Sequence, residues 1–297
     1  MQYEQIAYEV TQKRAIITLN RPEQRNALSL RLHEELAHAL LEADEDDAVS
    51  CIILRGAGKD FCGGVDLKEL DYKRGPGYRG AAEIADDSWH LERQTRLRMT
   101  ILDVYKPVVA QIHGTCIAGG TDLALLCDLI IVADDARIGH PPVRDLGSPP
   151  NQMWLYHCGP QWAKRFLLTG DCVTGKDAVG LGLALMSAPA DRLEAEVNAL
   201  VDRMVLIDHH LLAANKRIVN LGLELMGMRT LQRLASENDA RGHRAPSTRR
   251  FRKTLQEKGV REAVADRDGQ FGDGYIRFSA PGVAAPSSFS DGTDPAE

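Results

Sequence analysis

The sequence predicts an α/β domain followed by a helical C-terminal region, and three observations support this fold class. In the first half of the chain, short apolar runs typical of strands alternate with segments whose apolar residues recur at helical spacing. From about residue 160 onward, successive helical patterns take over. The chain has 297 residues, of which 44% are hydrophobic, so it can bury a substantial core without disulfides or metals.

Five strands are expected in the first half of the chain. The apolar runs that predict them occupy residues 6–10, 14–19, 51–55, 107–112 and 129–133. Between them, apolar residues at helical spacing predict helices over residues 29–45, with Ser29 as the N-cap, over residues 91–104, and from Thr121 onward. Residues 71–90 combine glycines with charged side chains and are interpreted as a surface loop or lid.

The second half of the chain is expected to be helical and then disordered. Helices are expected over residues 160–169, 175–183, 191–206, 209–226, 228–240 and 249–265. Residues 279–297 are rich in Ser, Pro, Gly and Ala and are expected to be a disordered tail. We therefore divide the chain into a core carrying the functional site (residues 1–190), a helical region (residues 191–278) and the tail.

The charge balance limits the classes of partner. The formal net charge is −6, which argues against a general nucleic-acid binder. Residues 241–261 nevertheless hold eight Lys or Arg and one acid, Glu257. This basic stretch is either a solvated surface or an element that contacts a phosphate or another subunit.

The N-terminus and the cysteines indicate a cytoplasmic protein. No signal peptide is apparent and no apolar run is long enough to span a membrane, so no membrane partner is expected. The six cysteines form no CxxC pair and match no zinc-ligand spacing, so we expect reduced, mostly buried thiols and no metal site.

Two glycine-containing segments are the candidates for carrying chemistry. Residues 58–70 and residues 113–128 each follow a predicted strand and contain a Gly-Gly pair, Gly63-Gly64 and Gly119-Gly120. Backbone N–H groups at the start of a helix have no partner within the helix, so two such loops could direct two N–H donors at one oxygen, as in an oxyanion hole. The alternative is that the glycines serve only turns and close packing.

These motifs carry a family resemblance. FCGGVDL (61–67) and HGTCIAGGTDLALLCD (113–128) occur in order with NRPEQRNALS (20–29) and RIGHPP (137–142). In this combination the chain resembles the enoyl-CoA hydratase/isomerase (crotonase) superfamily over about residues 5–265. The resemblance implies a spiral of repeated ββα units with a C-terminal helical trimerisation region, and a homotrimer or homohexamer. It also implies an acyl-CoA thioester substrate and no cofactor, because coenzyme A is part of the substrate.

The resemblance also implies which residues form the site. The N–H groups of Val65 and Gly119 would stabilise the thioester enolate. Lys68 would contact a CoA phosphate or be solvated. The full set of residues expected along the substrate is Arg25, Ala27, Gly63, Gly64, Val65, Asp66, Leu67, Lys68, Gly119, Gly120 and Val143.

The acid and base groups depart from the hydratase pattern. Asp122 stands where the family's first catalytic glutamate is expected, and it would transfer a proton or merely cap the helix. The position of the second glutamate falls on Pro142 or Val143, and neither can transfer a proton. We take Asp145 as the replacement, and its alternative roles are to pair with Arg144 or to belong to a surface turn. Further candidates, each with a structural alternative, are His140 and, on the expected lid, Asp86, Asp87 and His90.

The expected function is therefore that of a 2-enoyl-CoA hydratase. Isomerisation of an enoyl-CoA or dienoyl-CoA, or other enolate chemistry that needs one carboxylate, is the first alternative. The second alternative is a largely non-catalytic acyl-CoA-binding paralogue. Trp154 and Tyr156 would line the acyl pocket or belong to the core, and Cys62 is expected to be a packing residue rather than a nucleophile.

Overall fold

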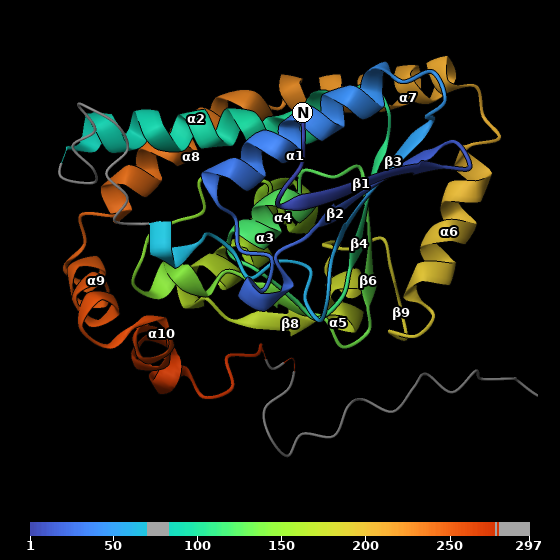
Figure 1. Ribbon diagram of the computed structural model, residues 1–297. Helices are drawn as coiled ribbons and strands as arrows, with labels where there is room; N and C mark the ends of the chain where they lie inside the picture. Colours follow the sequence, from blue (N-terminus) through green and yellow to red (C-terminus); the bar gives the residue numbers. More distant parts are fainter. Residues whose placement is uncertain (70–82, 277, 279–297) are drawn as a thin grey trace, which may run out of the picture.

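The computed structural model describes residues 1–69, 83–276 and 278 and is built on two sheets (Figure 1). The larger sheet has six strands in the order β1-β2-β3-β4-β6-β9. Only the β1–β2 pair is antiparallel, and the remaining neighbours are parallel. The strands of this sheet are Ile6–Thr11 (β1), Arg14–Leu19 (β2), Cys51–Gly56 (β3), Val108–Ile112 (β4), Leu129–Ala133 (β6) and Met186–Ala188 (β9). Apart from β9, these are the strands that the apolar runs predicted.

A second, smaller sheet was not predicted. Its strands are Thr115–Ile117 (β5), Arg137–Gly139 (β7) and Cys172–Thr174 (β8), in the order β5-β7-β8. Each of these strands is only three residues long, like β9, so none of them spans enough positions to show a strand periodicity in the sequence.

The helices cover the larger sheet and continue beyond it. They are Leu30–Glu45 (α1), Ile84–Asp103 (α2), Gly119–Ala124 (α3), Trp154–Thr169 (α4), Gly175–Gly180 (α5), Leu193–Met204 (α6), His209–Leu225 (α7), Met228–Gly242 (α8), Pro246–Lys258 (α9) and Val260–Asp268 (α10). Ser29 caps α1 as predicted, since its side chain accepts a hydrogen bond of 3.0 Å from the Leu32 N–H.

The first half of the chain repeats one unit: a strand of the larger sheet, a short extended segment and a helix. In one repeat β4 leads to β5 and α3, and in the next β6 leads to β7 and then α4. The short segments pair with each other, because Cys62 after β3 bridges Cys116 in β5, and β5 pairs with β7. This arrangement matches the predicted series of ββα units, and it places the ends of the predicted glycine loops side by side.

Two helix predictions were wrong at their boundaries. Helix α2 begins at Ile84, so Asp86, Asp87 and His90 lie on a helix and not on a lid. The predicted helix over residues 249–265 is two helices, because Gly259 has φ +89° and interrupts it. Of the predicted lid, residues 70–82 lie outside the described part of the chain, as does the predicted disordered tail.

Helices α2 and α8 lie side by side, while α9 and α10 fold back below them (Figure 1). Arg144, whose side chain is 2% exposed, ties α10 to the core through ion pairs with Asp171 (2.9 Å) and Asp268 (2.8 Å). Its guanidinium also stacks 3.9 Å from the centre of the Phe271 ring. The C-terminal helices are thereby held close to the strand ends that carry the glycine loops.

The cysteine prediction agrees with the structure. All six thiols are free, and all but the half-buried Cys158 are buried. Burial raises the pKa of Cys62 to about 12, so this thiol stays protonated near neutral pH and suits the predicted packing role. The described residues contain no helix long and apolar enough to cross a membrane.

Candidate active site

A cavity of about 680 Å³ lies where the two glycine loops meet α2, α8 and the C-terminal helices. Its wall includes nine of the residues predicted from the sequence: Arg25, Ala27, Gly63, Val65, Asp66, Leu67, Lys68, Gly119 and Asp122. The prediction therefore located this cavity from motifs that are up to 97 residues apart in the chain.

Backbone hydrogen bonds join the two glycine loops. The Cys62 N–H donates to the Thr115 carbonyl at 2.9 Å, and the Ile117 N–H donates to the Cys62 carbonyl at 3.1 Å. On the other side of the first loop, Leu28 donates to the Gly64 carbonyl at 2.8 Å and accepts from the Asp66 N–H at 3.0 Å. The first loop is therefore fixed along both edges.

This bonding leaves two N–H groups open to the cavity. Because Leu28 bonds the residues on either side of Val65, the Val65 N–H points away from Leu28. The Gly119 N–H is the first of α3, where an N–H has no partner within the helix, and the N-cap Ala118 offers no side-chain acceptor. A Cβ placed on Gly119 would lie 3.4 Å from the Val65 nitrogen, so the two donors are neighbours.

Two predicted glycines lie behind the cavity wall and not in it. Gly64 has φ +103°, and a Cβ there would lie 2.7 Å from the Cβ of Ala118. A Cβ on Gly120 would lie 2.5 Å from the Cys62 carbonyl oxygen. Both glycines allow the two loops to approach closely, and neither Gly64 nor Gly120 lines the cavity.

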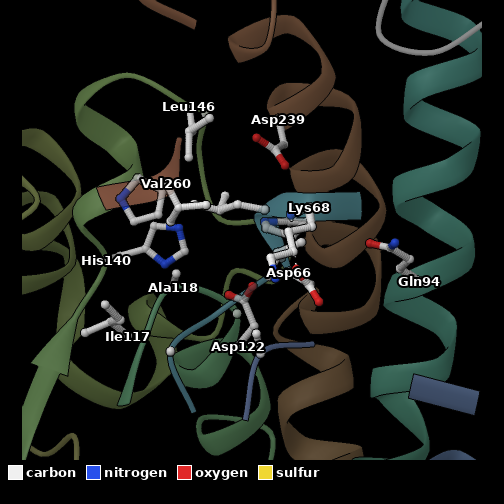
Figure 2. Close-up of a pocket in the computed structure, with 18 of the residues that line it drawn as sticks. Asp66, Lys68, Gln94, Ile117, Ala118, Asp122, His140, Leu146, Asp239 and Val260 are labelled. Carbon is white, nitrogen blue, oxygen red and sulfur yellow. Dashed lines mark hydrogen bonds between the residues drawn. The ribbon is translucent and has the colours of Figure 1, made fainter. Parts of the chain in front are cut away.

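Asp122, on the same short helix as Gly119, is buried and directs its carboxyl into the cavity (Figure 2). Among the described residues, neither of its carboxyl oxygens has a hydrogen-bond partner. Burial raises its pKa to about 7. The positive charge of Arg98 opposes this shift, and the carboxyl of Asp239 adds to it. A carboxyl with this pKa can accept or donate a proton near neutral pH.

The residues predicted along the CoA moiety have different surroundings. Asp66 forms an ion pair with Arg21 at 2.8 Å and accepts a hydrogen bond of 3.0 Å from the Lys68 N–H, so it holds its own loop. Arg25 and Lys68 are exposed at the cavity wall, where a phosphate could reach them.

The predicted second acid does not lie at the cavity. Asp145 and Val143 are absent from its wall, whereas Pro142 and Gly147 on either side of them line it. Burial raises the pKa of Asp145 to about 7, and the charge of Arg267 opposes this shift. The charge of Arg144 also opposes this pKa shift, although the ion pairs of that side chain are with Asp171 and Asp268.

His140 lines the cavity but cannot supply the missing acid. Burial lowers its pKa to about 3, and the charges of Arg267 and Arg98 add to this effect, so the ring is neutral near pH 7. The two aromatic residues considered for the acyl pocket do not line the cavity. Trp154 is completely buried, with its ring centre 4.9 Å from that of Phe166, as a core residue would be.

Sequence reasoning named Asp87 and His90 as candidates on a lid, but it missed that they belong to a polar surface made by α2 and α8. From α2, the buried Asp87, His90, Gln94 and Arg98 all face the cavity. From α8 come Asp239 and, one turn later, His243. The signal was available as polar residues at spacings of three and four along one helix face, but the same pattern is typical of a solvated face.

Comparison with known protein families decides the class of this protein. The family described as enoyl-CoA hydratase/isomerase matches residues 9–262. The chain belongs to this family. This chain is 33% identical over 251 residues to a putative enoyl-CoA hydratase of Mycobacterium tuberculosis, and the match covers 76% of each chain. It is 35% identical over 196 residues to a probable enoyl-CoA hydratase of Bacillus subtilis, covering 65% of this chain and 71% of that one.

Solved structures agree with this assignment. An enoyl-CoA hydratase from Mycobacterium smegmatis superposes with a TM-score of 0.86 at 36% identity, covering 92% of this chain and 96% of that chain. An enoyl-CoA hydratase/isomerase from Xanthobacter autotrophicus gives 0.84 at 32% identity, covering 91% and 99%. These matches confirm the predicted crotonase-like α/β fold with C-terminal helices, and family membership makes the protein a hydratase/isomerase-type enzyme.

Proposed function

We propose that this family member adds water to the double bond of a 2-enoyl-CoA thioester. The observation that carries the proposal is the placement of Asp122 beside the neighbouring N–H groups of Val65 and Gly119 at one cavity wall. Two such donors can stabilise the negative charge that develops on the thioester oxygen. The relatives named as enoyl-CoA hydratases support the same reaction.

The reaction assigns a distinct task to each group. The oxygen of water bonds to C3 of the acyl chain as the water releases one proton, which balances the proton that Asp122 later regains, and the electron pair of the C2–C3 double bond moves toward the thioester as an enolate. The N–H groups of Val65 and Gly119 hold the enolate oxygen. Asp122 in its protonated form then delivers a proton to C2, and its pKa of about 7 keeps a protonated fraction near neutral pH.

The reaction needs no group beyond the CoA substrate. Water supplies the oxygen, and backbone N–H groups stabilise the charge that a metal would otherwise have to stabilise. Arg25 and Lys68 at the exposed part of the cavity wall are the proposed contacts for the CoA phosphates. The cytoplasmic location predicted from the sequence stays a prediction.

Isomerisation is the second candidate, and one observation favours it. The cavity wall has Pro142 at a position where the hydratase pattern has a second carboxylate. Moving a double bond needs the enolate and a proton carrier, but it does not need a group that activates water.

Isotope uptake separates the two candidates. We would incubate a panel of short, medium and long trans-2-enoyl-CoA thioesters with the protein in H₂¹⁸O and in D₂O and follow the products by mass spectrometry. Incorporation of ¹⁸O supports hydration, and deuterium without ¹⁸O supports isomerisation. Asp122→Asn should lower either rate by about 100-fold or more while sparing CoA-ester binding, and Glu237→Gln, an exposed carboxylate on α8, serves as the control.

We also propose that α7 contributes to a contact between subunits in a homotrimer or homohexamer. Its outer face exposes Leu211 (59%), Ile218 (66%) and Leu225 (91%), which is unusual for large apolar side chains on one helix. Light scattering of the purified protein should give a trimer or hexamer mass. Ile218→Asp should shift that mass toward the monomer. A parent protein that already has the mass of a monomer would contradict the proposal.

A further inference from the structure

Helix α8 presents a second buried carboxyl, Asp239, to the cavity that Asp122 faces. Figure 2 shows the two side chains directed at the same space, Asp122 from α3 and Asp239 from α8. Asp239 is 4% exposed, and its Oδ1 atom has no hydrogen-bond partner among the described residues. An unpartnered carboxyl oxygen that is buried costs stability, so its retention points to a use in chemistry.

The other acids at this cavity are occupied or solvated. Glu23 is exposed, and Asp66 forms an ion pair with Arg21 at 2.8 Å. Asp87 accepts a hydrogen bond from the Nδ1 atom of His243 at 2.7 Å. Of the acids in the described cavity wall, Asp122 and Asp239 are the two that combine burial with an oxygen that has no hydrogen bond, and Oδ1 of Asp239 has only a 3.4 Å ion pair with Nε2 of His243.

We propose that Asp239 is the second catalytic carboxyl, which takes the proton from the attacking water, and that His243 and Asp87 are positioning residues that hold it. This inference rests on the hydration proposed above. Asp239 would replace the carboxylate that is missing from the segment around Pro142, and it does so from a different element, the C-terminal helix α8.

The surroundings of Asp239 fix its position and its charge. The Ser148 N–H donates a hydrogen bond to its carboxyl, and the Nε2 atom of His243 lies 3.4 Å from Oδ1. Gly147 makes room for this carboxyl, since a Cβ at that position would lie 2.1 Å from Oδ1. Burial raises the pKa of Asp239 to about 7, while the charge of His243 opposes the shift.

The groups that bear on the titration of Asp239 come from several elements. Those around it are His243 (just after α8), Asp87 and Arg98 (α2), Asp122 (α3) and, facing His243, Arg252 (α9). Because the pKa of each carboxyl is about 7, the fraction of protein in which Asp239 is ionised and Asp122 is protonated passes through a maximum near neutral pH. The hydration rate should therefore follow a bell-shaped pH profile.

The proton balance of the step is complete. Asp239 takes one proton from water while the water oxygen bonds to C3, and Asp122 gives one proton to C2 as the enolate collapses. The product then holds the oxygen and one hydrogen of the attacking water, together with the hydrogen that Asp122 delivered to C2, which equals the net addition of one water molecule. A proton passing from Asp239 to Asp122 through solvent restores the starting state.

The test compares two reactions of the same protein. In Asp239→Asn, ¹⁸O incorporation into the enoyl-CoA panel should fall about 100-fold or more. Deuterium exchange at C2 of the matching saturated acyl-CoA thioesters in D₂O should stay within about threefold, because it needs only the N–H donors and Asp122. Retained exchange also shows that the variant is folded, and Glu237→Gln on the solvent side of α8 is the matched control.

His243→Gln tests the positioning role by its pH profile. Loss of the imidazolium charge should move the rising limb of the hydration profile to higher pH, because that charge lowers the pKa of Asp239. Hydration by Asp239→Asn within about threefold of the parent would overturn the inference while leaving hydration itself established. A parent protein that takes up no ¹⁸O from any thioester overturns the proposed hydration and this inference together.

Discussion

Replacing Gly64 with alanine should damage the oxyanion site through packing alone. The residue has φ +103°, a conformation that a side chain disfavours by about 1–3 kcal/mol. The added Cβ would lie 2.7 Å from the Cβ of Ala118, and relieving such an overlap in a packed site costs about 1–3 kcal/mol more. We therefore expect a loss of about 2–6 kcal/mol in the free energy of unfolding.

The activity of Gly64→Ala should fall even at temperatures where the variant is fully folded. The clash would push apart the loops that carry the Val65 and Gly119 N–H groups, and losing one oxyanion donor typically lowers kcat by about 100-fold or more. Stability is measured by calorimetry, and activity as the saturated hydration rate at a temperature where the variant is folded.

A second substitution tests the clash, with Ala118→Gly alone as its reference, because Ala118 has φ +54° and gains from glycine even without the clash. Ala118→Gly in the Gly64→Ala background removes the opposing Cβ, so it should return about 1–3 kcal/mol of stability and part of the rate. Gly180→Ala, at an exposed glycine with no atom near the added Cβ, is the control for the change in residue type. A Gly64→Ala variant with the stability and rate of the parent would refute the reasoning.

Three further predictions concern charge and local structure. The folded-state pKa of Asp122, about 7, lies above its ordinary value, so ionisation of this group destabilises the fold as pH rises from about 4 to about 7. Asp122→Asn should therefore raise Tm relative to the parent more at about pH 8 than at about pH 5, and an equal effect at both would contradict the assigned shift. Arg144→Met removes one ion-pair partner from Asp171 and Asp268, which keep Arg165 and Arg267, and should cost about 1–3 kcal/mol in urea unfolding, against little change for the exposed Arg249→Met. Ser29→Ala removes the cap of α1 and should cost about 1 kcal/mol in the same assay.

The sequence by itself determined the fold class and one half of the chemistry. Apolar residues located five of the six strands of the larger sheet, because each is five or six residues long and so shows an alternating or continuous apolar pattern. The family resemblance carried by the glycine motifs pointed to the N–H groups of Val65 and Gly119, and the structure places these two donors next to each other. Asp122 followed from its place just after the second motif, and the structure buries it at the predicted cavity.

The tertiary structure decided where a second proton carrier can lie. Sequence reasoning sought it within a few residues of Pro142 and chose Asp145, which the fold turns away from the cavity. Asp239 reaches the cavity because α8 packs against α2 far along the chain, and no local pattern distinguishes its carboxyl from one on a solvated helix face. Burial also sets the pKa of Asp122 and Asp239, and burial is a property of the packed molecule rather than of the residues near each in sequence.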